Sequence, residues 1–197
     1  MRARDYATLA RQYYPSETIF DDPLFLQMLN EARNRILLLA GITVDISYPL
    51  TNPDNTYHVP VHQTIVGVYY YNNLTQKEYV LPRYYFKSVY RWKTTPALFL
   101  VNGFPYGYFW DAINNILTLL PEDATYSEKD KIRISFVPFA EPFTSWDDDE
   151  IVLPEQVQFA VPIEYAIRLA MFDMQYQIAD GLRNLLVYNL QKTARGG

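Results

Sequence analysis

The sequence contains no cysteine, and only 2 of its 197 residues are histidine. Without cysteine the chain cannot form disulfides, thiolate metal sites or a cysteine nucleophile, and it is compatible with assembly in a reducing cytoplasm. With 7 glycines in the whole chain, no glycine-rich loop that could cradle phosphate groups is present. The composition therefore argues against several familiar catalytic and nucleotide-binding classes.

The chain also lacks a long apolar run and an excess of positive charge. Its longest apolar run, Ile36 to Ala40, is too short to span a bilayer, and the start Met1-Arg2-Ala3-Arg4-Asp5 lacks the apolar stretch of a secretory signal. We therefore expect no membrane association. The formal net charge of −5 argues against a protein whose main task is to grip nucleic acid, but it is compatible with a wall past which DNA slides.

Aromatic residues are abundant, with 18 Tyr and 11 Phe. Tyrosine combines an apolar ring with a polar tip, so it suits surfaces that are wet in a monomer and buried in a complex. The alternative is that these tyrosines face outward from strands, where tyrosine is favoured. Both interpretations stay open. The hydrophobic and charged fractions, 49% and 20%, are typical of a folded domain.

The first part of the chain is predicted to be helical. Asp22 and Pro23 form an N-cap and first helical position, and Gly41 is a good stop because it tolerates a left-handed backbone. We predict a helix over about residues 22–40 and a shorter one over Asp5 to Gln12. Apolar residues recur at helical spacing at Phe25, Leu29, Ala32, Ile36 and Ala40.

The middle of the chain, from Ile42 to Phe139, is predicted to be β. Alternation of apolar and polar residues over Ile42–Tyr48 is typical of a half-buried strand, and the pairs Asn72-Asn73, Asn102-Gly103 and Asn114-Asn115 indicate hairpin turns. Turn chemistry also appears at residues 51–55. Further strands are predicted at Ile65–Tyr71, Tyr79–Leu81, Leu98–Val101, Tyr106–Trp110, Ile116–Leu120 and Lys131–Val137.

The last part returns to helix after a run of four acids, residues 147–150, which we expect to form a solvated loop. Pro154 can open a helix, and Pro162 is expected to kink or restart it. Whether the helix runs on or breaks into a hairpin at Asp180-Gly181 stays open. A helical stripe comprises Ile163, Ile167, Ala170, Met174 and Ile178, continued by Leu182 and Leu185.

The simplest architecture is an α+β fold. A helical body is expected from residues 1–41 and 147–192, with an antiparallel β-sheet or small barrel inserted at residues 42–146. Residues 193–197 are expected to be a flexible, weakly basic tail.

Few residues carry recognisable chemistry. His58 and His62 flank Pro60, which excludes a helix there, and in an extended chain they lie roughly 13 Å apart, too far for one metal ion. The acidic run lacks the ligand spacing of a calcium loop. A glycosidase-like carboxylate pair stays open, but nothing points to one. We predict no catalytic residue, no cofactor and no metal.

Aromatic and basic residues interleave near the middle of the chain. The aromatic cluster comprises Tyr69-Tyr70-Tyr71, Tyr84-Tyr85-Phe86 and Tyr90-Arg91-Trp92, interleaved with the basic residues Arg83, Lys87, Arg91 and Lys93. This cluster could be a base-stacking platform or a protein contact. The net acidity of the chain favours the protein contact. We predict a subunit or tail interface at Tyr84, Tyr85, Tyr90, Arg91 and Trp92.

The order of elements resembles the head-to-tail adaptor (connector) proteins of tailed bacteriophages, including tail tubular protein A and the gatekeeper-ring proteins. The resemblance covers most of the chain and is strongest over residues 116–192, although no diagnostic motif is present. Pro162 departs from the expected long, straight helix. The segments that carry the resemblance are Ile116–Pro121, Lys131–Pro138, Val152–Glu155 and Ile163–Gln175.

This resemblance implies a structural virion protein and no enzyme. Such proteins form rings, commonly of twelve copies, beneath the portal protein, and they extend the DNA channel without sequence-specific DNA binding. Tail or nozzle proteins dock on the far side. The resemblance places the chain in the virion neck, assembled in the host cytoplasm. It also implies that the terminal segment inserts into the portal; here that segment is Leu190, Gln191, Lys192, Thr193, Ala194, Arg195, Gly196 and Gly197.

Two alternatives stay open. One is another tail or baseplate module with the same sheet-and-helix plan. The other is a carbohydrate-binding or hydrolytic domain, favoured only by exposed tyrosine and tryptophan.

Overall fold

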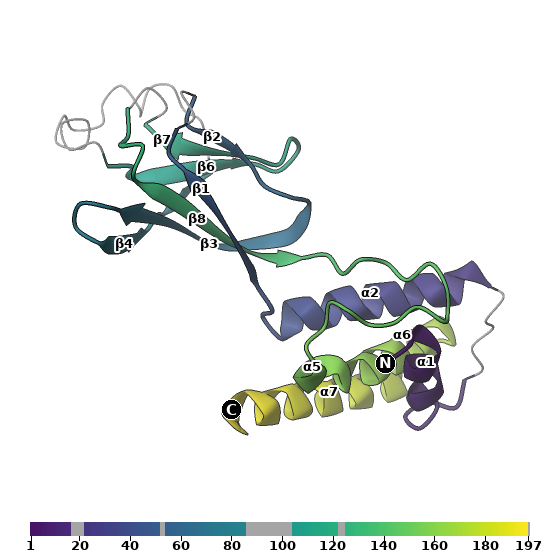
Figure 1. Cartoon of the computed structure of the whole chain (residues 1–197). Coiled ribbons are helices and arrows are strands. Elements are labelled where there is room, and N and C mark those ends of the chain that lie inside the picture. Colours follow the sequence, from purple (N-terminus) through teal and green to yellow (C-terminus); the bar gives the residue numbers. More distant parts are fainter. Residues whose placement is uncertain (17–21, 52–53, 86–103, 122–124, 197) are drawn as a thin grey trace. The chain divides into compact units, whose positions relative to one another are not determined.

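A computed structural model describes residues 1–16, 22–51, 54–85, 104–121 and 125–196. The chain divides into two compact units, a helical unit made of Met1–Ile42 and Phe139–Gly197 and a β unit made of Thr43–Pro138. Figure 1 shows the helices in one unit and both sheets in the other. The predicted α+β class is confirmed.

The firmest local prediction, the first long helix, is also confirmed. Helix α2 spans Pro23–Leu39, and the carboxylate of Asp22 accepts a hydrogen bond from the amide of Leu24 at 2.9 Å. Gly41 has a φ of 63°. The amides of Gly41 and Ile42 return to carbonyls of the last helical turn, which satisfies groups that would otherwise lack partners.

Helix α6 forms the centre of the helical unit. It spans Ala160–Phe172, follows the short helix α5 at Glu155–Gln158, and is buried along most of its length. Helices α1 (Ala3–Ala10), α2, α5 and α7 (Tyr176–Gly196) all pack against it. Pro162 lies in the first turn of α6, where its missing amide costs nothing. The proline therefore restarts the helix, one of the two outcomes expected for it.

The hairpin between the last two helices turns at Met174. The φ of Met174 is 59°. The amides of Met174 and Gln175 donate to the carbonyls of Met171 and Ala170 at 3.1 and 2.7 Å. This closure is a left-handed helix cap of the kind that usually uses glycine. Helix α7 then passes through Asp180 and Gly181 without a break.

The expected flexible tail, residues 193–197, has helical backbone in the part that the structure describes. Helix α7 continues through Gly196, so residues 193–196 are helical. Thr193 is half-buried, and its hydroxyl donates to the carbonyl of Asn189 at 3.1 Å. Backbone hydrogen bonding propagates one residue at a time once a helix exists, so α7 extends beyond its last fully buried residue, Leu186.

The described residues of the β unit form two four-stranded sheets, ordered β1-β8-β3-β4 and β2-β7-β6-β5. Among these strands, all pairs are antiparallel except the short parallel pair β5–β6. The hairpins predicted at Asn72-Asn73 and Asn114-Asn115 form, whereas Leu98–Val101 and Asn102-Gly103 lie outside the described residues. The strands span Val44–Pro49 (β1), Thr56–His58 (β2), His62–Asn72 (β3), Lys77–Val80 (β4), Arg83–Tyr84 (β5), Gly107–Asp111 (β6), Ile116–Leu120 (β7) and Lys131–Pro138 (β8).

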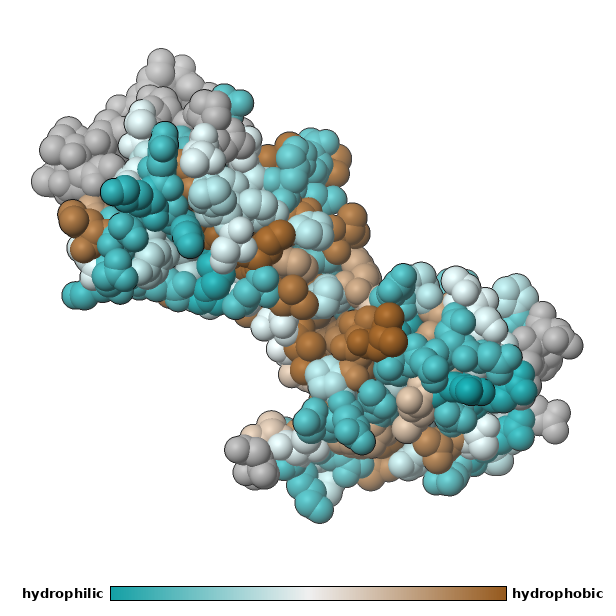
Figure 2. Space-filling model, in the orientation of Figure 1, coloured by the Kyte–Doolittle hydropathy of each residue, from teal (hydrophilic) through white to brown (hydrophobic). Residues whose placement is uncertain are grey.

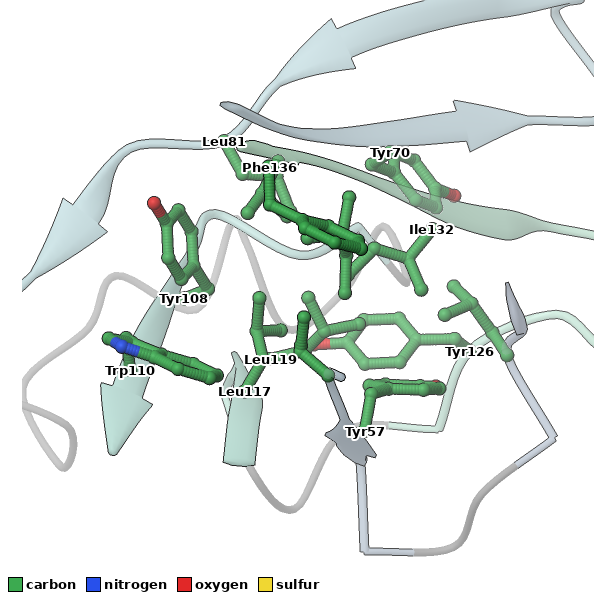
Figure 3. Close-up of a cluster of buried hydrophobic side chains, with 14 residues drawn as sticks. Tyr57, Tyr70, Leu81, Tyr108, Trp110, Leu117, Leu119, Tyr126, Ile132 and Phe136 are labelled. Carbon is green, nitrogen blue, oxygen red and sulfur yellow. The ribbon is translucent and has the colours of Figure 1, made fainter. Parts of the chain in front are cut away.

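The core of the β unit lies between its two sheets. In Figure 3, Leu117 and Leu119 from β7 lie opposite Ile132 and Phe136 from β8. Several tyrosines belong to this core and are buried, so they are largely shielded from solvent and do not face outward from the sheets. The tyrosines concerned are Tyr57, Tyr70, Tyr108 and Tyr126.

Residues 139–146, which the sequence placed with the β insert, belong to the helical unit. Side-chain amides on α2 hold this segment. Asn30 accepts from the amide of Phe143 at 2.8 Å and donates to its carbonyl at 3.0 Å, and Asn34 accepts from the amide of Ala140 at 2.7 Å. The apolar side chains of Phe143 and Trp146 are buried beside them.

Candidate assembly surface

The acidic run does not form a uniformly solvated loop. Asp147 and Asp149 are exposed, but the side chain of Glu150 is 0% exposed and that of its partner Arg33 only 1%. The two make a bidentate pair at 2.7 and 2.9 Å. Asp148 accepts hydrogen bonds from the backbone of residues 144 and 145. The expectation is therefore wrong at Glu150, because a tertiary partner on α2 compensates its burial.

This buried pair joins three segments of the helical unit. Besides Glu150, the guanidinium of Arg33 donates to the side chain of Asn30 and to the carbonyl of Glu141, and it stacks 3.6 Å from the ring centre of Phe143. From α1, the hydroxyl of Tyr6 reaches Glu150 at 3.4 Å. The arrangement saturates both charges, as expected of a structural ion pair.

The pKa values of this network follow from burial and charge. Burial acts to raise the pKa of Glu150, but hydrogen bonds from Arg33 and from the amides of Val152 and Leu153 outweigh it, and the pKa is lowered. Burial and the adjacent carboxylate of Glu150 raise the pKa of the Tyr6 phenol. Glu150 is thus held ionised, as a fixed partner for Arg33.

The two histidines lie in different sheets. His58 belongs to β2, whereas His62 begins β3 and sits between Trp110 and Phe136, with ring centres 5.0 and 5.4 Å apart. The Nδ1 atom of His62 is 2.7 Å from the carbonyl oxygen of Pro60. Within the described residues, no group of three or more potential ligands could hold a metal ion.

The predicted aromatic interface is described only in part. Tyr84 and Tyr85 are exposed, and the guanidinium of Arg83 stacks 4.9 Å from the Tyr85 ring centre. Tyr90, Arg91 and Trp92 lie outside the described residues, as do Lys87 and Lys93. The neighbouring tyrosines divide between the two faces of a strand. Tyr70 is buried, while Tyr69 lies under the guanidinium of Arg133 at 4.1 Å.

The predicted portal-binding segment forms the end of α7. Leu190 and Thr193 are half-buried, whereas Gln191, Lys192 and Ala194 are exposed. Arg195 and Gly196 complete the helix, and Gly197 lies outside the described residues.

An apolar surface on α7 was missed by the sequence reasoning. Residues 178, 181, 185 and 188 follow a spacing of three and four that places them on one face, and none belongs to the buried stripe of Ala179, Leu182 and Leu186. We call this face the ridge. It consists of Ile178, Gly181, Leu185 and Tyr188, whose three apolar side chains are 43%, 38% and 64% exposed.

The signal for the ridge was present in the sequence, because apolar residues on α7 exceed what one buried face needs. Other large apolar side chains of the helical unit are also exposed, including Met174 at the turn before α7 and Phe172 at the end of α6. Hydrophobic side chains reach the surface in Figure 2 (brown). Exposed apolar side chains that gather on one helix face mark interaction sites.

A groove of about 770 Å³ lies within the same helical unit, where α2 and α7 both pack against α6. Its floor is formed by Ile167 and Met171 of α6, its walls by Leu24, Met28 and Leu39 of α2 and by Val187 of α7. We call it the groove.

Four of the five charged residues that line the groove have ion-pair partners, and the fifth is Arg35. Arg168 contacts Glu31 at 2.5 Å and Glu164 at 3.5 Å, and Arg183 contacts Asp180 at 2.6 Å. Burial raises the pKa of Glu164, against the opposing effect of the nearby arginines. Most of the charge in the groove is therefore compensated by partners within this chain.

No helix among the described residues is long and apolar enough to cross a membrane. Neither a protein-family model nor a curated protein matches the chain.

Proposed function

We propose that this chain is a structural subunit that assembles with copies of itself into a ring beneath the portal of a tailed bacteriophage. The ring joins head to tail and extends the DNA channel. The observation that carries the proposal is the apolar surface that the helical unit leaves exposed on α7, at Ile178, Leu185 and Tyr188. A subunit whose task is assembly needs such a surface.

The arrangement of the chain also supports this role. Both ends of the chain build the helical unit, and the β unit is inserted between them, which is the plan that the resemblance to connector proteins implies. The buried ion pair of the helical unit is engaged in holding the fold. Arg33 and Glu150 saturate each other and the surrounding backbone, so they serve structure and not chemistry.

Portal, tail and DNA are the proposed partners. The C-terminal end of α7, from Leu190 to Gly197, is proposed to dock on the portal, and the exposed Tyr84 and Tyr85 of the β unit to face a neighbouring subunit or tail protein. The net charge of −5 suits a channel wall that DNA passes without being gripped.

Electron microscopy of the purified protein mixed with the portal ring of its own phage tests the proposal. We expect the isolated protein to be a monomer or weak oligomer by light scattering, and added portal rings to carry a second ring with matching rotational symmetry. A stable ring that forms without portal and does not bind it would contradict the proposal that the portal templates the ring. A monomer that ignores portal and binds glycans would instead favour the carbohydrate-binding alternative.

A further inference from the structure

The ridge and the groove lie on nearly opposite sides of α7. At about 100° per residue, Arg183 and Val187, which line the groove, are roughly 160° around the helix from the middle of the ridge. Both surfaces belong to the helical unit. One copy therefore presents an apolar ridge on one side of α7 and an apolar groove on the other.

The dimensions of the two surfaces match. The groove follows α2 from Leu24 to Leu39, roughly 22 Å at 1.5 Å per residue, and the ridge from Ile178 to Tyr188 spans roughly 15 Å. The ridge therefore fits within the length of the groove. The charges are compatible too. The residues beside the ridge at heptad spacing are the uncharged Gln177, Asn184 and Gln191, and the groove charges other than Arg35 have ion-pair partners within the chain.

The glycine at position 181 gives independent support for a contact at the ridge. It lies inside a helix, where glycine is less favourable than alanine, and it does not have a positive φ. A Cβ added at Gly181 would meet no atom of the chain within 4 Å. Nothing within the helical unit therefore requires glycine there. A glycine in the middle of an apolar ridge does allow the backbone of a second molecule to approach closely.

We propose that the ridge of one copy packs into the groove of the next. This contact is head-to-tail, because two different surfaces meet, and such contacts close into rings or continue as filaments. A contact between two ridges would instead stop at a dimer. The inference rests on the proposed function for its closure into a ring. The contact itself concerns only copies of this chain.

A ridge of four residues is much smaller than the 20–30 residues per side of a standard interface. A single ridge–groove contact is therefore weak, which fits a protein that associates weakly alone and closes its ring on a template. In a closed ring every copy uses both surfaces.

Two charge variants and their mixture test the contact by sedimentation velocity. Leu185→Glu places a charge on the ridge. Leu24→Glu places one in the groove, at the second residue of α2, where the helix dipole favours a carboxylate and the fold is preserved. Leu74→Glu, at a 90% exposed leucine of the β unit, is the matched control and should associate like the wild type.

Each variant alone is expected to associate at least tenfold more weakly than the wild type. Their equimolar mixture should regain a 1:1 pair and nothing larger, because one intact ridge still meets one intact groove. If Leu24→Glu associates like the wild type, ridges pair with ridges and the proposal is overturned. Failure of the mixture to pair overturns it as well.

A cross-linking experiment can detect the contact even if it is too weak to observe by sedimentation velocity. The chain has no cysteine, so Leu185→Cys combined with Gln27→Cys introduces the only two. A short bismaleimide should then give a ladder of dimers, trimers and larger species. The pair Glu128→Cys with Gln27→Cys should give none. Absence of the ladder overturns the proposal.

The outcomes separate this inference from the proposed function. Portal rings that still recruit the Leu185→Glu and Leu24→Glu variants as complete rings would overturn the ridge–groove contact and leave the connector function standing. A cross-linked ladder from a protein that does not bind portal rings would support the ridge–groove contact and contradict the connector function.

Discussion

At Arg33, one guanidinium meets a carboxylate, an amide side chain, a backbone carbonyl and an aromatic ring. A buried pair of this kind contributes little compared with a well-packed apolar pair, but removing one member leaves the other charge uncompensated. The consequence of breaking the pair is therefore large and asymmetric.

Glu150→Ala is expected to lower the free energy of unfolding of the helical unit by about 3–5 kcal/mol, because Arg33 stays buried without its carboxylate. Asp149→Asn, at an exposed acid in the same run, is the matched control and should change stability little. Urea unfolding followed by circular dichroism measures both. Equal effects of the two substitutions would contradict the role assigned to the buried pair.

The same carboxylate predicts a pH dependence. The pKa of Glu150 lies below its ordinary value of 4.5, so the unfolded chain takes up this proton before the folded one as pH falls. The stability from ionised Glu150 is therefore complete above about pH 4.5 and is lost as pH falls through the lower folded-state pKa. Glu150→Gln cannot titrate.

The difference in free energy of unfolding between the wild type and Glu150→Gln should be constant near neutral pH. It should shrink progressively below about pH 4.5. Urea unfolding of both proteins at a series of pH values measures this difference. A difference that stays level down to pH 3 would show that Glu150 is not held ionised by Arg33.

At the scale of single elements, two glycines offer a matched pair. A Cβ at Gly41 or at Gly181 would meet no atom within 4 Å, but Gly41 has a φ of 63° and Gly181 is helical. Gly181→Ala should raise the free energy of unfolding by about 1 kcal/mol, and Gly41→Ala should lower it by about 1–2 kcal/mol. Thermal unfolding of both variants measures the contrast. The same sign for both would mean that packing, not backbone conformation, decides.

The elements that the sequence predicted well are those with local signals. Asp22, Pro23 and Gly41 act on the backbone within one turn of α2, so no knowledge of the rest of the fold is needed. The turn at Met174 could not be predicted in this way, because methionine seldom adopts a positive φ, whereas Asp180-Gly181 looked like a better break. Tertiary packing of α7 on α6 overrode that local preference.

The candidate surfaces were less accessible to sequence reasoning. The burial of Glu150 depends on Arg33, 117 residues away, and the acidic run gave no sign of which acid has such a partner. On α7 the buried and exposed apolar stripes overlap in sequence, so Ile178 and Leu185 were assigned to the same stripe as Leu182. Only the packing against α6 separates them.

At the scale of the whole molecule, the C-terminal end of α7 carries the proposed link to the portal. Flexible segments pay roughly 1–2 kcal/mol per residue in backbone entropy when they become ordered. Because residues 190–196 are already helical, most of that cost is absent here. On the proposed ring, several such ends would act together, and avidity can raise binding by roughly 10² to 10⁴.

Deleting residues 190–197 should therefore leave the fold nearly unchanged yet abolish docking on the portal. The fold should survive because Ala179, Leu182 and Leu186, the buried stripe of α7, are retained. The ridge is retained as well, so self-association should persist. Co-sedimentation with portal rings measures docking. If the deleted form co-sediments like the intact protein, the segment is not the anchor. As a milder test, Lys192→Ala with Arg195→Ala should weaken docking, and its salt dependence should shrink if these two charges dominate the contact.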